Sequence, residues 1–297
     1  MIFTSHTLAK PWGATVEDKR SELKKIIMDT KTLPTLPGVI NKLNALSEND
    51  KASVQEMAKI VSSDQVLSAR ILRLANSPSY GFYRVSTISN AMILLGVNVV
   101  KSLALSSSIF AIMEKNSVGL WEHSLGVGVA ANLLARKLGL PECEEIATAA
   151  LLHDIGKVIV SLKCSEAEME IQKLVRDRQI YITEAEREVI DTDHAEIGGW
   201  LSKSWFLPDK LSEPIACHHD VNKSENHRIK TSVVHIADVL IKASGFGNSG
   251  DRYVPVIQKT AWDTLKLNQQ IMTELVEEIE DKLVEVRNFS LEMMSVE

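Results

Sequence analysis

The chain has 297 residues, 45% of them hydrophobic and 24% charged, and its formal net charge at pH 7 is −6. This length suits one large domain or two of ordinary size, and the hydrophobic fraction is sufficient for a sizeable core. No block of like charges marks a general nucleic-acid surface, so that class of partner is not expected. The three cysteines are far apart, no signal peptide is recognisable, and no apolar run reaches the roughly 20 residues of a membrane helix. These features predict a cytoplasmic protein that does not cross a membrane.

In the first 115 residues, apolar side chains recur at helical spacing, and prolines interrupt the pattern between helices. Alternating apolar and polar residues, the pattern of a half-buried strand, are absent. The spacing predicts helices over residues 16–29, 38–49, 53–63, 63–81, 86–96 and 97–115.

The same spacing continues after residue 116. Gly139 is placed to end the first helix of this part, and the Gly/Asn/Ser-rich stretch 245–252 predicts a flexible loop. The expected helical segments cover residues 122–139, 144–162, 165–179, 183–205, 208–220, 230–244 and 268–286. The fold class is therefore all-α. We expect two packed helical subdomains, 1–115 and 116–297, without a flexible linker between them.

Six of the eight histidines and two aspartates fall within or at the ends of helices in the second part of the chain. They are His123, His153, Asp154, His194, His218, His219, His235 and Asp238. A buried carboxylate is costly unless it is paired or binds a metal, and imidazole with carboxylate is a ligand set for transition metals. Because adjacent helical residues point about 100° apart, Asp154 could bridge two metals while His153 faces one of them. The alternative is a set of histidines that simply hydrogen-bond within a core.

The order His…His-Asp…His…His-His…Asp resembles the HD superfamily of metal-dependent phosphohydrolases. The segments "HDIGK" and "HAEIG" and the doublet "HH" are most similar to its HD-GYP branch. In the first part, "LPTLPGVINKLNAL", "IVSSDQVLSARILRLANSPSYG" and "ISNAMILLGVNVVKSLAL" resemble the HDOD domain, an HD-related output domain of bacterial signalling proteins. These motifs together span roughly residues 30–240. The resemblance implies that the second subdomain is a helical bundle of the HD type.

The resemblance also implies a metal site with two positions, which share Asp154 as a bridging ligand. The first would use His123, His153, Asp154 and Asp238; the second would use Asp154, His194, His218 and His219. We expect one or two iron ions, with manganese, nickel or zinc as alternatives. After His219 the chain continues "DVNKSENHR", without the Gly-Tyr-Pro motif that accompanies cyclic di-GMP hydrolysis. That substrate is therefore not expected.

Three further residues near the motif are candidates for supporting roles. Lys157 follows the His-Asp doublet by one helical turn; in hydrolytic relatives such a lysine faces substrate phosphate, and the alternative is a lysine paired with a nearby carboxylate. His235 is either a partner of a metal ligand or a packed core histidine. Asp220 is expected to cap a helix end or to orient an imidazole.

Two classes of function remain open from the sequence. The first is a signalling regulator that acts through a protein partner and retains a metal site. It is favoured by the HDOD-like part, which contains no recognisable catalytic pair. The second is a metal-dependent phosphohydrolase that takes a phosphate-containing small ligand, favoured by the complete ligand set and Lys157. Di-iron redox or oxygen-linked chemistry is a variant that uses the same ligands. We expect the regulatory role.

Overall fold

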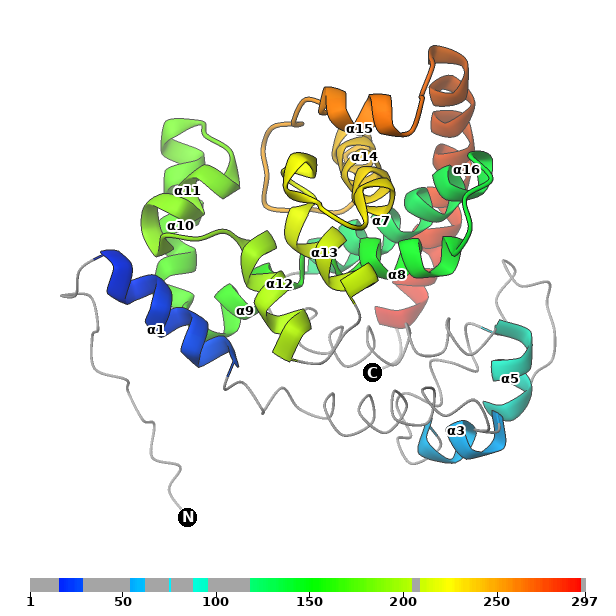
Figure 1. The fold of residues 1–297 in the computed structure, drawn as a ribbon, viewed down its shortest axis with the longest axis horizontal. Coiled ribbons are helices and arrows are strands. Elements are labelled where there is room, and N and C mark those ends of the chain that lie inside the picture. The colour runs from blue at the N-terminus through cyan, green and yellow to red at the C-terminus, as the bar shows by residue number, and fades with distance from the viewer. Residues whose placement is uncertain are drawn as a thin grey trace.

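The computed structural model describes residues 16–28, 54–61, 75, 88–95, 118–204 and 209–294. Every regular element in these ranges is helical (Figure 1), which confirms the all-α fold class. The elements are α1 (Val16–Met28), α3 (Val54–Val61), α5 (Ile88–Leu95), α7 (Val118–Lys137), α8 (Cys143–Leu152), α9 (Ile155–Lys163), α10 (Ser165–Arg178), α11 (Ile182–Ile190), α12 (His194–Ser204), α13 (Asp209–Cys217), the 3-10 turn η2 (Val221–Lys223), α14 (Arg228–Ser244), α15 (Lys259–Thr264) and α16 (Gln269–Met294).

Helix α7 is the central element of the described bundle, and α8, α14 and α16 all pack against it. It ends as the sequence predicts: Gly139 has φ +63°, and the Leu140 N–H reaches the Ala135 carbonyl at 2.9 Å. A left-handed glycine just after the last turn satisfies carbonyls that the helix leaves free. A neighbouring group of helices, α9 to α12, lies beside this bundle, and α1 packs on α12 (Figure 1).

Two apolar clusters build the core. One gathers side chains from α9, α10, α11 and α12 and includes Leu23 and Ile27 of α1. The other joins α7, α8, α14 and α16. Residues next to the expected ligands belong to both clusters: Leu152 and Ile155 flank the His-Asp doublet in the first, and Ala237 precedes Asp238 in the second. The polar residues are therefore embedded where two apolar cores meet.

Two segments expected as single helices are each divided. The apolar segment 144–162 ends as α8 at Leu152 and restarts as α9 at Ile155, so the doublet forms a turn between two helices. Segment 183–205 is interrupted at residues 191–193, where Asp191 has φ +57°. Apolar spacing does not reveal such breaks, because the buried face continues on either side of them.

The stretch 245–252, expected to be flexible from its composition, is instead packed against the bundle. Phe246 and Ser249 are buried, the Asn248 N–H donates to the Gly119 carbonyl at 2.7 Å, and Asp251 accepts from the Ile182 N–H at 3.1 Å. Gly247 allows one close contact: it has φ +69°, and a Cβ there would lie 2.2 Å from the backbone nitrogen of His123. These contacts hold the stretch against the bundle.

Several sequence predictions lie outside the described residues. These are the helices expected at 38–49 and 97–115, the helix expected at 63–81 apart from Ala75, which is helical, and the boundary near residue 115. The division into subdomains 1–115 and 116–297 thus stays a prediction. Within the described ranges, no helix combines the length and apolar character needed to cross a membrane.

Candidate metal centre

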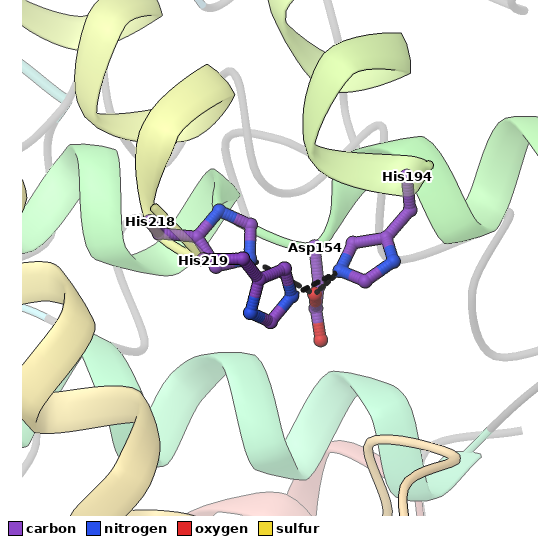
Figure 2. Close-up of side chains that lie close together, drawn as sticks. All are labelled: Asp154, His194, His218 and His219. Carbon is purple, nitrogen blue, oxygen red and sulfur yellow. Dashed lines mark hydrogen bonds and ion pairs between the residues drawn. The ribbon is translucent and has the colours of Figure 1, made fainter. Parts of the chain in front are cut away.

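The seven residues expected as metal ligands lie together in one buried centre. Six of the side chains are fully or almost fully buried, and His219 is half-buried. The potential ligand atoms form two groups, and within each group they all lie within 4.8 Å of one another. We call His123, His153 and Asp238, with Oδ2 of Asp154, the first subsite. The second subsite is His194, His218 and His219 with Oδ1 of Asp154 (Figure 2).

Asp154 lies between the two subsites and turns one carboxylate oxygen toward each. Its Oδ2 is 3.3 Å from His153 Nε2 and 3.7 Å from His123 Nε2. Its Oδ1 is 3.0 Å from His194 Nε2 and 3.8 Å from His218 Nε2. This is the arrangement of a carboxylate that can bridge two metal ions, with one oxygen for each.

The break between α8 and α9 places the doublet. His153 closes α8, and Asp154 precedes α9 with φ −94° and ψ 12°, outside the regular helical region. At Gly156 the backbone of α9 meets the start of α12 so closely that a Cβ would lie 1.9 Å from the His194 carbonyl oxygen. Only glycine fits at this contact, and the contact brings Asp154 within reach of His194.

Helix α12 begins at His194 because its first turn is capped. Oδ1 of Asp193 accepts from the Glu196 N–H at 2.9 Å, and Oδ2 accepts from Arg187 at 2.6 Å. An aspartate that accepts from the N–H three residues later satisfies one of the free donors of a helix start. This cap fixes the position of His194, the first residue of the helix.

Three imidazoles are oriented through Nδ1. The Nδ1 atoms of His153 and His218 lie 2.7 and 2.8 Å from the carbonyls of Ala150 and Ile215. The Nδ1 atom of His194 lies 2.7 Å from Glu186 Oε2. A carbonyl or carboxylate can only accept, so each Nδ1 donates its hydrogen. This orientation turns Nε2 toward the centre, which is the usual arrangement of a metal-binding histidine.

Buried lysines contact the carboxylates of the first subsite. Lys242 donates to Asp238 Oδ2 at 2.9 Å and also contacts Asp251 Oδ2 at 2.8 Å. Lys157 donates to Asp154 Oδ2 at 2.8 Å and to the Ser249 carbonyl at 2.9 Å. Of the two alternatives that the sequence leaves for Lys157, the structure has the lysine paired with a carboxylate.

These surroundings keep both aspartates charged. Burial by itself raises the pKa of each carboxyl, but neighbouring cations outweigh it. His153 and Lys157 hold the pKa of Asp154 well below its ordinary value, and Lys242 and His123 do the same for Asp238. A deprotonated carboxylate is the form that binds a metal.

The histidines divide into two kinds. Burial lowers the pKa of His218 and of His219 well below the ordinary value, and neighbouring imidazoles lower it further. Burial also lowers the pKa of His153 and His194, but the carboxylates of Asp154 and Glu186 outweigh it and raise both to about 9. A metal ion would take the place of those two protons.

Several buried polar atoms in the centre lack a partner, and their chemistry fits a metal. His153 Nε2, His218 Nε2 and Asp154 Oδ1 make no hydrogen bond. The Nε2 atoms of His194 and His219 face each other at 2.8 Å. Unpaired buried polar atoms are rare because each carries the cost of desolvation. A cation bound among these nitrogen and oxygen atoms would satisfy them together.

The other candidate residues have supporting contacts. His235 Nδ1 lies 2.8 Å from the His218 carbonyl, so it holds the backbone of a ligand rather than a ligand ring. Asp220 accepts from the Asn222 N–H and caps η2, as one of its two predicted roles requires.

Sequence reasoning missed Glu186, Lys242 and Asp251. For Lys242 a signal existed, because it follows Asp238 by four residues and therefore shares its helical face. Glu186 and Asp251 are joined to the centre by tertiary contacts, which the local pattern does not indicate.

A cavity of about 230 Å³ lies beside the centre. Its polar lining includes Lys157, Ser161, Glu168, Gln172, Glu186 and Ser249. Lys157 and Glu186 thus border the cavity and also contact the ligands Asp154 and His194. The cavity is large enough for a small ligand or for movement of the Lys157 side chain.

The fold and this centre define an all-helical protein with a buried cluster of histidines and aspartates suited to metal. A family model for the HDOD domain matches residues 33–221, which is more than half of the chain. The chain belongs to the HDOD domain family, as the sequence motifs predict.

Solved structures of similar proteins share the fold. An HDOD domain protein of unknown function from Geobacter sulfurreducens is 25% identical, with a TM-score of 0.76 over 93% of this chain and 98% of that one. A protein of Shewanella amazonensis, provisionally described as a phosphohydrolase, is also 25% identical, with a TM-score of 0.67 over 91% of this chain and 96% of that one.

A curated relative extends beyond the chain. An uncharacterised protein of Treponema pallidum is 24% identical over 246 residues, which make up 80% of this chain and 48% of the relative. The chain thus spans about half the length of this relative.

Proposed function

We propose that the chain is a regulatory protein of bacterial signal transduction, which acts through a protein partner and binds one or two transition-metal ions in its buried centre. The metal-binding part rests on one observation: seven histidine and aspartate side chains meet in the core, and three of their potential ligand atoms make no hydrogen bond. Imidazole nitrogens with two carboxylates suit iron, which we propose as the metal; manganese, nickel and zinc share the same ligand preferences.

A regulatory role is supported by the burial of the centre and by the position of Lys157. Its side chain is only 8% exposed, and its ammonium group binds Asp154 and a backbone carbonyl. It is therefore engaged within the protein, whereas a phosphate-binding lysine must present its charge to a ligand. The HDOD domain, which matches residues 33–221, is in keeping with an output role.

A change in metal occupancy could affect the surface of the protein through helix α12. The ligands come from α7, the α8–α9 turn, α12, the turn after α13, and α14. Helix α12 also carries Trp200, over which Arg20 and Lys24 of α1 are stacked at 5.6 and 5.5 Å. A metal that favours one arrangement of α12 would shift the population of the helices packed on it. The affinity of a partner that binds α1 or its neighbours would change with that shift.

The second candidate function is a metal-dependent phosphohydrolase. It is favoured by the cavity beside Lys157 and by the 25% identity to the Shewanella protein. In that case bound metal would activate water and stabilise charge on the phosphate, while Lys157 would hold a phosphate-containing ligand. Redox chemistry at a di-iron centre would use the same ligands.

Metal analysis tests the shared basis of these proposals. We expect wild-type protein purified without oxygen to hold about one or two transition-metal ions per chain, and Asp154→Ala to hold almost none, because both subsites lose their common ligand. Equal and near-zero occupancy in the two proteins would contradict the metal site.

A second experiment separates regulator from enzyme. We expect a partner, isolated with the wild-type protein and then purified, to bind Asp154→Ala or His153→Ala with altered affinity. Metal-loaded protein should turn over phosphodiesters, cyclic di-GMP included, far more slowly than about 1 per second, a low rate for an enzyme. Efficient hydrolysis that Lys157→Ala abolishes without loss of metal would establish the phosphohydrolase instead.

A further inference from the structure

The two subsites differ in the charge that surrounds Asp154. Its Oδ2, the oxygen of the first subsite, accepts from the Lys157 ammonium group at 2.8 Å. Its Oδ1, the oxygen of the second subsite, lies 3.0 and 3.8 Å from the imidazoles of His194 and His218, and no lysine contacts it among the described residues. A cation that is not itself a metal ligand is thus present at one oxygen of the bridging carboxylate, whereas the other oxygen faces imidazoles that a metal would bind.

The two buried lysines, Lys242 and Lys157, differ in whether a second carboxylate compensates for their charge. The charge of Lys242 is shared between Asp238 and Asp251, so Asp251 compensates for it and Asp238 keeps its negative charge for a metal. The second partner of Lys157 is the neutral carbonyl of Ser249, so Lys157 neutralises Asp154 itself. Like charges at short range in a buried site repel strongly. Lys157 therefore opposes a divalent cation at the first subsite.

The charges around the second subsite instead favour a divalent cation. Behind His194, the carboxylate of Glu186 accepts from Nδ1 at 2.7 Å and from the His194 backbone N–H at 3.0 Å. A carboxylate that accepts from the far nitrogen of a ligand makes the imidazole a stronger donor to metal. The three imidazoles of this subsite thus have an anionic support, and its oxygen ligand has no competing ammonium group.

We propose that the two subsites fill in a fixed order, the second before the first, and that Lys157 is an internal cation that occupies the first subsite until it is displaced. This inference rests on the proposed metal site and specifies its regulation. The cavity beside the centre makes the displacement feasible: Lys157 lines it together with the carboxylates of Glu168 and Glu186. If the ammonium group moves away from Asp154, these two carboxylates line the cavity that it would enter.

The order is tested by titrating metal-free, full-length protein with Mn²⁺ without oxygen. Binding is followed by calorimetry, and electron paramagnetic resonance distinguishes an isolated ion from a coupled pair. We expect wild type to bind one ion tightly, with the spectrum of isolated Mn²⁺, and a second ion at least about tenfold more weakly. His218→Ala should lose the tight ion, whereas His123→Ala should keep it and lose the weak one.

Substitution of Lys157 then isolates its role. Lys157→Met keeps the length of the side chain and removes the charge, so we expect it to tighten the second ion at least about tenfold while the first is unchanged. Lys157→Arg keeps the charge and should behave like wild type. Lys163→Met is the matched control, since Lys163 lies on the exposed end of the same helix.

Each other outcome overturns the inference. Two ions of equal affinity in wild type, or loss of the tight ion in His123→Ala, would exclude the order while leaving the metal site intact. An unchanged second affinity in Lys157→Met would exclude the role of the lysine; should this variant not fold, the His123→Ala and His218→Ala pair still decides the order. Failure of every protein to bind metal would remove the proposed function together with this inference.

Discussion

Three of the ligand histidines have a second group that fixes the ring. For His153 and His218 this group is a carbonyl of the same helix three residues earlier, which the helix supplies regardless of side chains. For His194 it is a carboxylate from another helix, Glu186, which is buried and eight residues away. The ring of His194 is thus the one whose orientation and basicity a single side-chain substitution can change.

We expect Glu186→Gln to weaken metal binding at the second subsite by about 10- to 100-fold, because the amide replaces a charged acceptor behind His194 with a neutral one. The measurement is the tight dissociation constant for Mn²⁺ or Zn²⁺. Glu188→Gln is the control, since Glu188 lies on the exposed side of α11 and pairs with Arg178. Equal affinities in the two variants would show that Glu186 is only a packing residue.

At the scale of helices, close approach decides where the ligands lie. Helix α9 reaches the start of α12 at Gly156, and Gly198 of α12 meets Ile215 of α13, where a Cβ would lie 2.8 Å from the isoleucine side chain. The short distances between α9, α12 and α13 are what join Asp154, His194 and His218 in one subsite.

Gly156→Ala should therefore destabilise the protein by several kcal/mol, because its Cβ would overlap backbone atoms that cannot move without separating two helices. It should also lose the tight metal ion. Gly128→Ala in α7 provides the comparison: its Cβ would have ordinary contacts of 3.4 Å or more with α8, and alanine favours a helix by roughly 0.5–1 kcal/mol. Chemical denaturation of both variants measures the difference. A stable Gly156→Ala protein with full metal content would refute this account of the contact.

The contact between α13 and the start of α14 should depend on pH. Glu213 of α13 accepts from the backbone N–H groups of Asn226 and His227, at the start of α14, and from Ser224. Burial raises the pKa of this carboxyl, but the three hydrogen bonds outweigh it and lower the pKa below its ordinary value. The charged form therefore stabilises the folded state.

Because the folded pKa is the lower one, this stabilisation is complete above the unfolded value of about 4.3 and is lost as pH falls through the folded value. We expect Glu213→Gln to reduce the free energy of unfolding by about 1 kcal/mol at pH 7, and the gap from wild type to close in acid. Glu225→Gln, an exposed neighbour, should show no gap at either pH. A gap that persists unchanged below pH 4 would exclude the charge as its source.

At the scale of the molecule, the centre joins elements that are distant along the chain. Its ligands span residues 123 to 238 and are flanked along the chain by residues of both apolar clusters. Bound metal would therefore connect the bundle around α7 to the group from α9 to α12.

Metal should accordingly stabilise the whole described fold. Saturation at about 100 times the dissociation constant corresponds to about 2.7 kcal/mol. We expect added Mn²⁺ to raise the thermal midpoint of wild type, a chelator to reverse the rise, and Asp154→Asn to show neither effect. A rise of the same size in Asp154→Asn would indicate binding elsewhere on the protein.

Much of the fold was predictable, since apolar spacing indicates helices and the ordered motifs indicate the HDOD family. Histidine and aspartate also stand out within apolar runs, and the resemblance to the HD superfamily implied which seven of them are candidate ligands. The break at His153-Asp154 could not be predicted, since the apolar pattern continues through it. Nor could the partnership of Glu186 with His194, which depends on how α11 turns into α12, or the packing of 245–252, whose glycines resemble those of a mobile loop.

The link from Asp238 through Lys242 to Asp251 ends at the surface. Asp251 accepts from the Ile182 N–H, and the residues beside this contact, Tyr181 and Tyr253, form an edge-to-face pair with ring centres 6.3 Å apart. Each tyrosine is 37% exposed. The molecule therefore has a place for a spectroscopic probe: a change in the charge of the buried centre that loosens Asp251 would alter the environment of two accessible phenol rings. The fluorine resonance of fluorotyrosine at these two positions could then follow the centre.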